Sequence, residues 1–195
     1  MLAAMKTRWA FGVTLIEVLV VLAVLGILTA VAAPSFADIL NRQRVQMVAA
    51  ELSNDLAFAR AEAGLGGKRN DVIVSFGQPA GMSCYTIRYF GASGGCDCSR
   101  PPGNACTGQT AELRTVQIPS SKGVHLRLTG QFDPFEPNSI SFQHPRMTNS
   151  VAGFAVKVIG LRGAQLQVQV NTMGRVSTCA PSGSTMSGVP TCASS

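Results

Sequence analysis

FGVTLIEVL, residues 11–19, opens an apolar run that continues to Ala33 and contains a single acidic residue, Glu17. The run has about 20 residues, the length that one helix needs to cross a hydrocarbon core about 30 Å thick. An ionised side chain at bilayer depth costs several kcal/mol, so Glu17 is a candidate functional residue whose partner has to be identified.

A partner for Glu17 would arise if the chain were cut after Gly12. The nearest basic residues in the sequence, Lys6 and Arg8, precede that glycine. Cleavage would give Val13 a cationic α-amino group one helical turn from the carboxylate, in the same copy or in a neighbour. The helix dipole also favours a carboxylate near a helix N-terminus.

This pattern resembles the class III signal of type IV prepilins and type II secretion pseudopilins. The resemblance implies a leader that ends at Gly12, N-methylation of Val13 after cleavage, and an assembly role for Glu17. Val13 stands where the family usually has Phe. Pro34 matches the helix-kinking proline of the family, which adds a second assembly residue.

An ordinary secretory signal peptide is the alternative interpretation of the same residues. Lys6 and Arg8 would form its basic region, Leu15 to Leu28 its apolar region, and Ala30-Val31-Ala32 its cleavage site. The two interpretations differ in the mature N-terminus, which is Val13 in one case and Ala33 in the other.

The charge distribution and the cysteines indicate how the chain is placed. The formal net charge is +6, and beyond Leu40 there are 14 Lys and Arg residues against 8 Asp and Glu residues. Basic residues before the apolar run favour a cytoplasmic N-terminus and a translocated C-terminal part. Six cysteines beyond the run agree, because disulfides persist in an oxidising compartment such as the periplasm.

The periodicity beyond the apolar run predicts the rest of the fold. Apolar residues recur at three- and four-residue steps from Val45 to Ala63, and the glycines at 64, 66 and 67 end the pattern. From Lys68 on, the period becomes two. This predicts strands near 72–76, 84–90, 113–118, 124–129, 140–143, 154–159 and 165–170. Residues 133–138 are predicted to be a plain loop and 183–195 a surface tail. The predicted fold class is α+β, a long N-terminal α-helix packed on a C-terminal antiparallel β-sheet head, and the resemblance implies that this layout is type IV pilin-like.

The order of elements and the C-terminal segment resemble the GspH/FimT branch of pseudopilins and minor pilins. Its C-terminal region typically ends in a strand–turn–strand followed by a Gly-Arg-Val element, which is Gly174-Arg175-Val176 here. DNA-binding FimT-like proteins have Gly-Arg-x-Arg, whose two guanidinium groups bind phosphates. Ser177 replaces the second Arg, so Arg175 is a candidate DNA contact but DNA binding is not favoured. The structural interpretation is a turn at Gly174 and a solvated strand edge at Arg175.

The cysteines fall into two groups. Cys179 and Cys192 flank a segment rich in Gly and Ser and are expected to form a disulfide, worth about 3 kcal/mol for a loop of this length. The other four allow three pairings, which the sequence leaves open: Cys84, Cys96, Cys98 and Cys106. One residue between Cys96 and Cys98 is a poor spacing for zinc, so no metal site is predicted.

The two histidines are the remaining candidates for chemistry. His125 is expected on the outward side of a strand, and His144 precedes Pro145 at a strand end. Neither has a nucleophile or carboxylate placed to act with it. We expect ordinary surface histidines, no cofactor, and a protein that is not an enzyme.

The combined prediction is a minor pilin or pseudopilin that assembles through its N-terminal helix into a type IV pilus or type II secretion pseudopilus, in its tip or initiation complex. The predicted segments are a leader (1–12), a transmembrane assembly helix (13–40), an amphipathic helix half (41–64) and a periplasmic β-rich head (65–195). The resemblance implies other pilin subunits, the prepilin peptidase, and the inner membrane with its assembly platform as partners. Two alternatives stay open: a DNA-binding minor pilin for natural transformation, and a secreted β domain.

Overall fold

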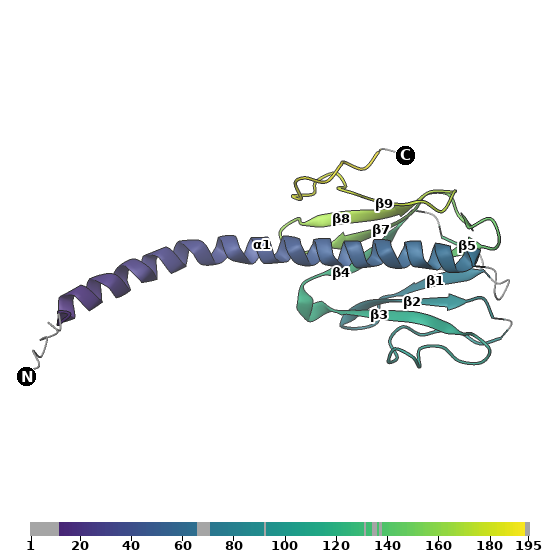
Figure 1. Ribbon diagram of the computed structural model, residues 1–195, viewed down its shortest axis with the longest axis horizontal. Coiled ribbons are helices and arrows are strands. Elements are labelled where there is room, and N and C mark those ends of the chain that lie inside the picture. The colour runs from purple at the N-terminus through teal and green to yellow at the C-terminus, as the bar shows by residue number, and fades with distance from the viewer. Residues whose placement is uncertain are drawn as a thin grey trace, which may run out of the picture. The chain divides into compact units, whose positions relative to one another are not determined.

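The computed structural model describes residues 12–65, 71–91, 93–130, 132–133, 136 and 138–193, so most of the predicted leader lies outside it. One helix, α1 (Leu15–Gly64), precedes the strands, which form two antiparallel sheets (Figure 1). The predicted α+β layout, a long N-terminal helix packed on antiparallel sheets, is confirmed at this level. Contacts divide the chain between Ile39 and Leu40 into two compact units, which are described separately.

The first unit contains the apolar part of α1. From Leu15 to Ala33 this part spans about 28 Å at a rise of about 1.5 Å per residue, close to the thickness of a hydrocarbon core. In the described residues α1 is the one helix long and apolar enough to cross a membrane. The hydroxyl of Thr29 donates to the carbonyl oxygens of Leu25 and Gly26 at 2.9 and 3.0 Å, so the helix itself satisfies this polar group.

The second unit begins with the amphipathic part of α1. Its core-facing residues are 0–1 % exposed: Val45, Ala49, Leu52, Leu56, Ala59 and Ala63. The predicted three- and four-residue spacing is therefore confirmed as a buried stripe. The helix ends at Gly64, where a Cβ atom would lie 2.4 Å from the Sδ atom of Met147. The helix end can approach Met147 this closely because residue 64 has no side chain.

The first sheet has five strands in the order β3-β2-β1-β5-β6. They are β1 (Val72–Gly77), β2 (Met82–Tyr89), β3 (Glu112–Pro119), β5 (Ser139–Gln143) and β6 (Thr148–Asn149). Val74 lies opposite Ile87 on β2 and Ile140 on β5, and all three side chains enter the core. Alternation places Ile73 and Arg88, which are also directly opposite each other, on the outer face.

The second sheet has four strands in the order β4-β7-β8-β9. They are β4 (His125–Thr129), β7 (Phe154–Ile159), β8 (Gln165–Val170) and β9 (Val176–Cys179). On β8 the buried residues are Leu166, Val168 and Val170, so the predicted alternation is confirmed. The sequence did not predict β6 or β9, because strands of two and four residues are too short to show a period of two.

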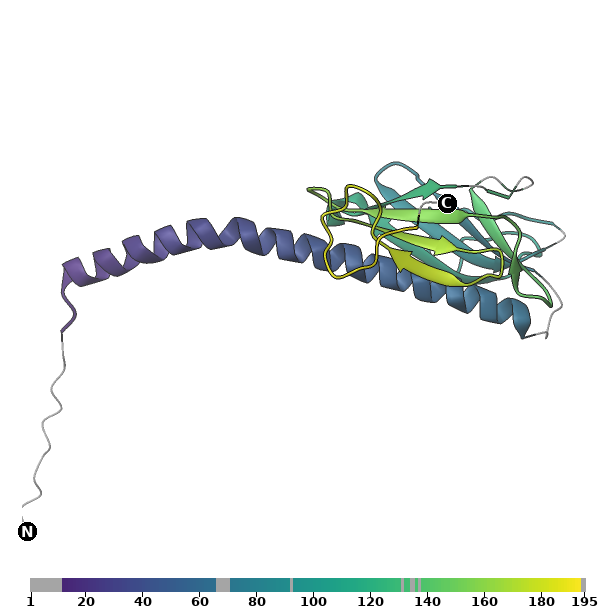
Figure 2. The ribbon, with the colours of Figure 1, turned by 90° about the horizontal axis from the view of Figure 1, so that it is seen from above.

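One hydrophobic core joins the helix to both sheets, and the second half of α1 lies along them (Figure 2). The ring of Phe76 lies 5.6 Å from that of Tyr85 in its own sheet and 5.7 Å from that of Phe154 in the other. A hydrogen bond also joins the two sheets: the amide nitrogen of Leu126 on β4 donates to Ser83 Oγ on β2 at 3.1 Å. These contacts make the second unit a single packed body.

The C-terminal segment lies mostly at the surface, as predicted, but it is also anchored to the second unit. Met186 is 7 % exposed, and Ser184 Oγ donates to the carbonyl oxygen of Gln165 at 2.5 Å. The amide of Thr185 donates to the carbonyl oxygen of Gly163 at 3.0 Å. A composition of small polar residues indicates a surface location, but it does not show that one apolar side chain within the segment packs into the core.

Candidate functional site

The predicted processing point lies in non-helical chain just before α1. Gly12, Val13 and Thr14 precede the helix, and the side chain of Val13 is 68 % exposed. A Cβ atom added to Gly12 would meet nothing within 4 Å. The peptide bond between Gly12 and Val13 is therefore accessible in this structure.

Glu17 lies in the first turn of α1, where Thr14 caps the helix. Thr14 Oγ1 accepts a hydrogen bond from the amide of Glu17 at 3.4 Å, and its carbonyl oxygen accepts from the amides of Glu17 and Val18 at 3.1 and 3.3 Å. Thr14-Leu15-Ile16-Glu17 thus has the spacing of a capping box. None of the ion pairs of the described residues includes Glu17.

The apolar part of α1 has no packing partner in the described residues. Its large hydrophobic side chains are 46–82 % exposed: Leu15, Ile16, Val18, Leu19, Val20, Val21, Leu22, Val24, Leu25, Ile27 and Leu28. Consecutive residues of this kind cover every side of a helix, which is typical of a helix surrounded by lipid or by other helices. Pro34 falls within α1, but its side chain lies outside the described part.

The structure places Arg175 in an exposed turn between β8 and β9. The side chain of Asn171 accepts from the amide of Arg175 at 2.8 Å, and Gly174 adopts a φ of 73°. A Cβ atom at Gly174 would lie 2.4 Å from the carbonyl oxygen of Met147. Ser177 is exposed on β9, the edge strand, so the structural interpretation of this motif agrees with the geometry.

All six cysteines form disulfides. The structure joins Cys179 to Cys192, and it resolves the open pairing as Cys84–Cys98 and Cys96–Cys106, with Cα–Cα distances of 4.9, 5.6 and 4.0 Å. Two of the three staple the loop between β2 and β3. In the described part of the chain, no group of three His, Cys, Asp or Glu side chains could hold a metal ion.

The stapled β2–β3 loop is also anchored by Glu112. Its carboxylate accepts from the amides of Gly103 and Ala105, both at 2.8 Å, and from Thr115 Oγ1 at 2.6 Å. Burial raises the pKa of Glu112, but these hydrogen bonds outweigh it and the net pKa is lowered. These bonds tie residues 103 and 105 of the loop to the start of β3.

His144 is not the ordinary surface histidine that the sequence predicts. It is half-buried, with Nδ1 2.8 Å from the carbonyl oxygen of Ala63, at the C-terminal end of α1. Its amide donates to Asp71 Oδ1 at 2.9 Å. Local sequence could not show the contact between His144 and Ala63, because these residues are 81 positions apart. His125 is exposed on β4, as predicted.

A polar cluster between α1 and the first sheet was also not predicted. Tyr85 donates to Asp55 Oδ2 at 2.8 Å, and Arg114 Nε lies 3.1 Å from the same oxygen. Burial, followed by the charge of Asp55, raises the pKa of Tyr85 far above its ordinary value. Nearby, Tyr89 donates to Glu62 at 2.8 Å. The sequence contains acids on the helix and two tyrosines four residues apart on one strand, but nothing in it shows which acid pairs with which tyrosine.

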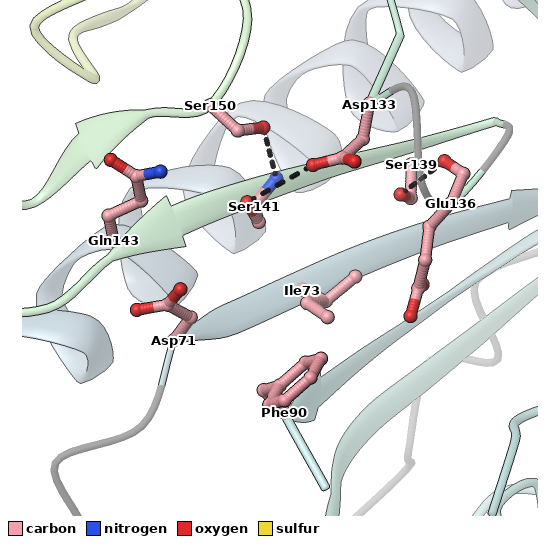
Figure 3. A pocket seen from close by; sticks show the side chains of 9 residues that line it. All are labelled: Asp71, Ile73, Phe90, Asp133, Glu136, Ser139, Ser141, Gln143 and Ser150. Carbon is pink, nitrogen blue, oxygen red and sulfur yellow. Dashed lines mark hydrogen bonds between the residues drawn. The ribbon is translucent and has the colours of Figure 1, made fainter. Parts of the chain in front are cut away.

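A cavity of about 500 Å³ opens on the outer face of the first sheet. Figure 3 shows three carboxylates around Ile73 and Phe90, from Asp71, Asp133 and Glu136. Both carboxylate oxygens of Glu136 accept from Nη2 of buried Arg88. Glu136 lies outside helix and strand, as the predicted loop requires, but its tie to the first sheet was not predicted. Ser139, Ser141 and Gln143 of β5 and Ser150 complete the lining.

No family model matches this chain, and no curated protein or solved structure matches it significantly. The geometry of its own residues is what bears on function.

Proposed function

We propose that this chain is a minor type IV pilin or type II secretion pseudopilin of the GspH/FimT kind, and that it is an assembly subunit without enzymatic activity. The observation that carries the proposal is the contrast within α1. Its second half buries an apolar stripe in a complete core, whereas its first half exposes its large hydrophobic side chains in the residues described. A helix of that kind is stable in a membrane or in a bundle of like helices.

The N-terminal residues support processing and assembly. An accessible bond after Gly12 suits a prepilin peptidase, and the resemblance implies N-methylation of Val13. Cleavage would create an amine within reach of the first turn of the helix, where Glu17 lies. An unpaired carboxylate in an apolar bundle is unfavourable, so pairing with the amine of a neighbouring copy would set the register between subunits.

The proposed location is the inner membrane, with the head in the periplasm, followed by a pilus or pseudopilus. The partners are other pilin or pseudopilin subunits, the prepilin peptidase and the assembly platform. Three disulfides in the head suit an oxidising compartment. A DNA-binding role in transformation is less supported, because Arg175 has Ser177 beside it in place of a second Arg.

The test is to express the full chain with a prepilin peptidase in a host that carries the remaining pilus or pseudopilus subunits. Mass spectrometry of the membrane fraction is expected to find an N-methylated mature chain that begins at Val13. Antibodies against the head are expected to find the chain in sheared filaments. A mature chain that begins at Ala33, or a chain absent from filaments, would contradict the proposal.

A further inference from the structure

The outer face of the four-stranded sheet is basic and carries no acid. We call this surface, formed by His125, Arg127, Lys157, Gln165, Gln167 and Gln169, the basic face. Because side chains alternate along a strand, these residues lie on the face of the sheet that points away from the buried residues of β4, β7 and β8. No Asp or Glu lies between Glu112 and Asp133 or after Glu136, so none of the four strands contains one.

Two cations are directly opposed on the basic face. Arg127 on β4 is the register partner of Lys157 on β7, and Lys157 is in turn the partner of Gln167 on β8. Like charges directly opposite each other destabilise a sheet. Among the described residues, neither cation belongs to an ion pair. The pair is unfavourable in the isolated chain and would become favourable against a negatively charged surface.

The same chain carries such a surface on its other sheet. The cavity of Figure 3 has three carboxylates, from Asp71, Asp133 and Glu136. Glu136 forms an ion pair with Arg88, Asp71 accepts from the amide of His144, and Asp133 accepts from Ser141 Oγ. The ring of Phe90, which is 53 % exposed, also lines it. Carboxylates and an exposed aromatic ring together suit a guanidinium or ammonium group.

We propose that the basic face of one copy docks on the acidic cavity of a second copy, with Arg127 and Lys157 directed toward Asp71, Asp133 and Phe90. Because the two surfaces differ, the contact is heterologous and continues from copy to copy. The contact goes beyond the proposed function and relies on it only for bringing copies side by side. Two cations would give few phosphate contacts, so the face suits nucleic acid less well.

The test uses the full chain in vesicles of zwitterionic phosphatidylcholine, with a benzophenone amino acid replacing Gln167. On irradiation, the expected product is a cross-linked dimer in which the peptide joined to residue 167 contains Asp71, Phe90 or Asp133. The double variant R127E/K157E is expected to lower the yield about tenfold, the loss of one or two good charge contacts. R100E/K122E makes the same change in net charge at exposed sites off the face and is expected to leave the yield unchanged.

A mixing experiment separates the two surfaces. Copies with D71N/D133N and the cross-linker keep only the basic face, and tagged copies with R127E/K157E keep only the cavity. Each is expected to give little dimer alone, whereas the mixture restores it in one orientation. Near-ultraviolet circular dichroism of each variant checks that the head is folded. If D71N/D133N does not fold, the single variant D133N replaces it in the mixture.

Several outcomes would overturn the proposal. They are cross-links that map elsewhere on the chain or to lipid, a mixture that restores no dimer, or loss of the cross-link when duplex DNA is added at about 150 mM salt. Failure of cleavage after Gly12 would contradict the proposed function but leave this contact standing, because the vesicles present the full chain whether or not it is processed.

Discussion

The two halves of α1 have similar local structure but opposite surroundings. From Val45 to Ala63 the apolar residues form one stripe, 0–1 % exposed, with polar and charged residues on the other sides. From Leu15 to Leu28 apolar residues occupy all sides and the least exposed large side chain, Val18, is still 46 % exposed. The second half is stabilised by its own chain. The first half exposes apolar side chains that no described residue of this chain covers.

The position of charge sharpens this comparison. In the second half, carboxylates pair with groups of the head: Asp55 with Tyr85 and Arg114, and Glu62 with Tyr89. In the first half, the amide of Glu17 donates to the helix cap Thr14. None of the ion pairs among the described residues includes the Glu17 carboxylate. The carboxylates of the second half are thus paired within one copy, and we infer that Glu17 is paired between copies.

The largest effect is expected for Gly12→Val. A side chain at this position should exclude the backbone from a tight peptidase site, so cleavage should be lost and the unprocessed chain should stay in the membrane. Gly26→Val is the matched control, since a Cβ atom at either glycine meets nothing within 4 Å. Mass spectrometry of the N-terminus measures the outcome. A product of Gly12→Val that still begins at Val13 would show that the signal has been misidentified.

Glu17→Ala is expected to be processed normally and to be retained better in the membrane, because a charge that costs several kcal/mol at bilayer depth is removed. Its incorporation into filaments should fall strongly, because the amine of Val13 loses its partner. Glu17→Gln and Thr14→Val distinguish charge from capping. Only the first should reproduce the assembly defect, as measured in sheared filaments. Normal incorporation of Glu17→Ala would remove the proposed role of this carboxylate.

Tyr85 of β2 donates to Asp55 in the second half of α1, so Tyr85→Phe should lower the free energy of unfolding by about 1–3 kcal/mol, because a buried carboxylate loses a hydrogen bond. Tyr89→Phe is the matched control. It removes a bond of the same length, 2.8 Å, but from a half-buried tyrosine, so we expect a loss below about 1 kcal/mol. Denaturant titration of the full chain in detergent, followed by near-ultraviolet circular dichroism, measures both. Equal losses would mean that burial does not distinguish the two pairs.

The pH dependence of stability should show the cost of burying Asp55. Burial raises its pKa, against the hydrogen bond from Tyr85 and the charge of Arg114, so the folded state holds this proton more tightly than the unfolded state. Asp55 therefore lowers the unfolding free energy progressively as pH rises above about 3.9, the ordinary Asp value. The unfolding free energy of Asp55→Asn minus that of the unmodified chain should increase from about pH 3.5 to pH 7.

Asp97→Asn is the control of opposite sign. Hydrogen bonds from the side chain and amide of Ser99 lower the pKa of Asp97, so its stabilising contribution is present above the unfolded pKa and lost as pH falls through the folded pKa. The same difference for Asp97→Asn should therefore decrease as pH rises. Curves of the same sign for the two variants would contradict this electrostatic account.

The smallest effect is expected for Arg175, on the exposed surface of the head. A single guanidinium gives few phosphate contacts, so the full chain in detergent should bind duplex DNA weakly at about 150 mM salt. Ser177→Arg should strengthen binding, and Arg175→Ala should change assembly little. Fluorescence anisotropy with labelled duplex measures the first two. Tight binding that depends on Arg175 would make the transformation function the better interpretation.

Strong periodicity made most of the fold predictable. The alternation of Gln and apolar residues on β8 and the three- and four-residue spacing from Val45 to Ala63 each report a local geometry. Short strands such as β6 and β9 contain too few residues for such a signal. The loop at residues 133–138 was predicted to be plain because nothing in its sequence shows that Glu136 reaches Arg88, 48 positions away.

The sequence by itself determined the features that repeat locally or lie in one short segment: the apolar run with Glu17, the buried stripe of α1, the longer strands and the isolated Cys179–Cys192 pair. Tertiary structure alone decided which cysteines join in the β2–β3 loop, that His144 contacts the end of α1, and that Arg127 lies opposite Lys157. The physical reason is that these contacts depend on how the strands pair and pack. Residues far apart in the chain meet only when a register is formed, and no local pattern contains that register.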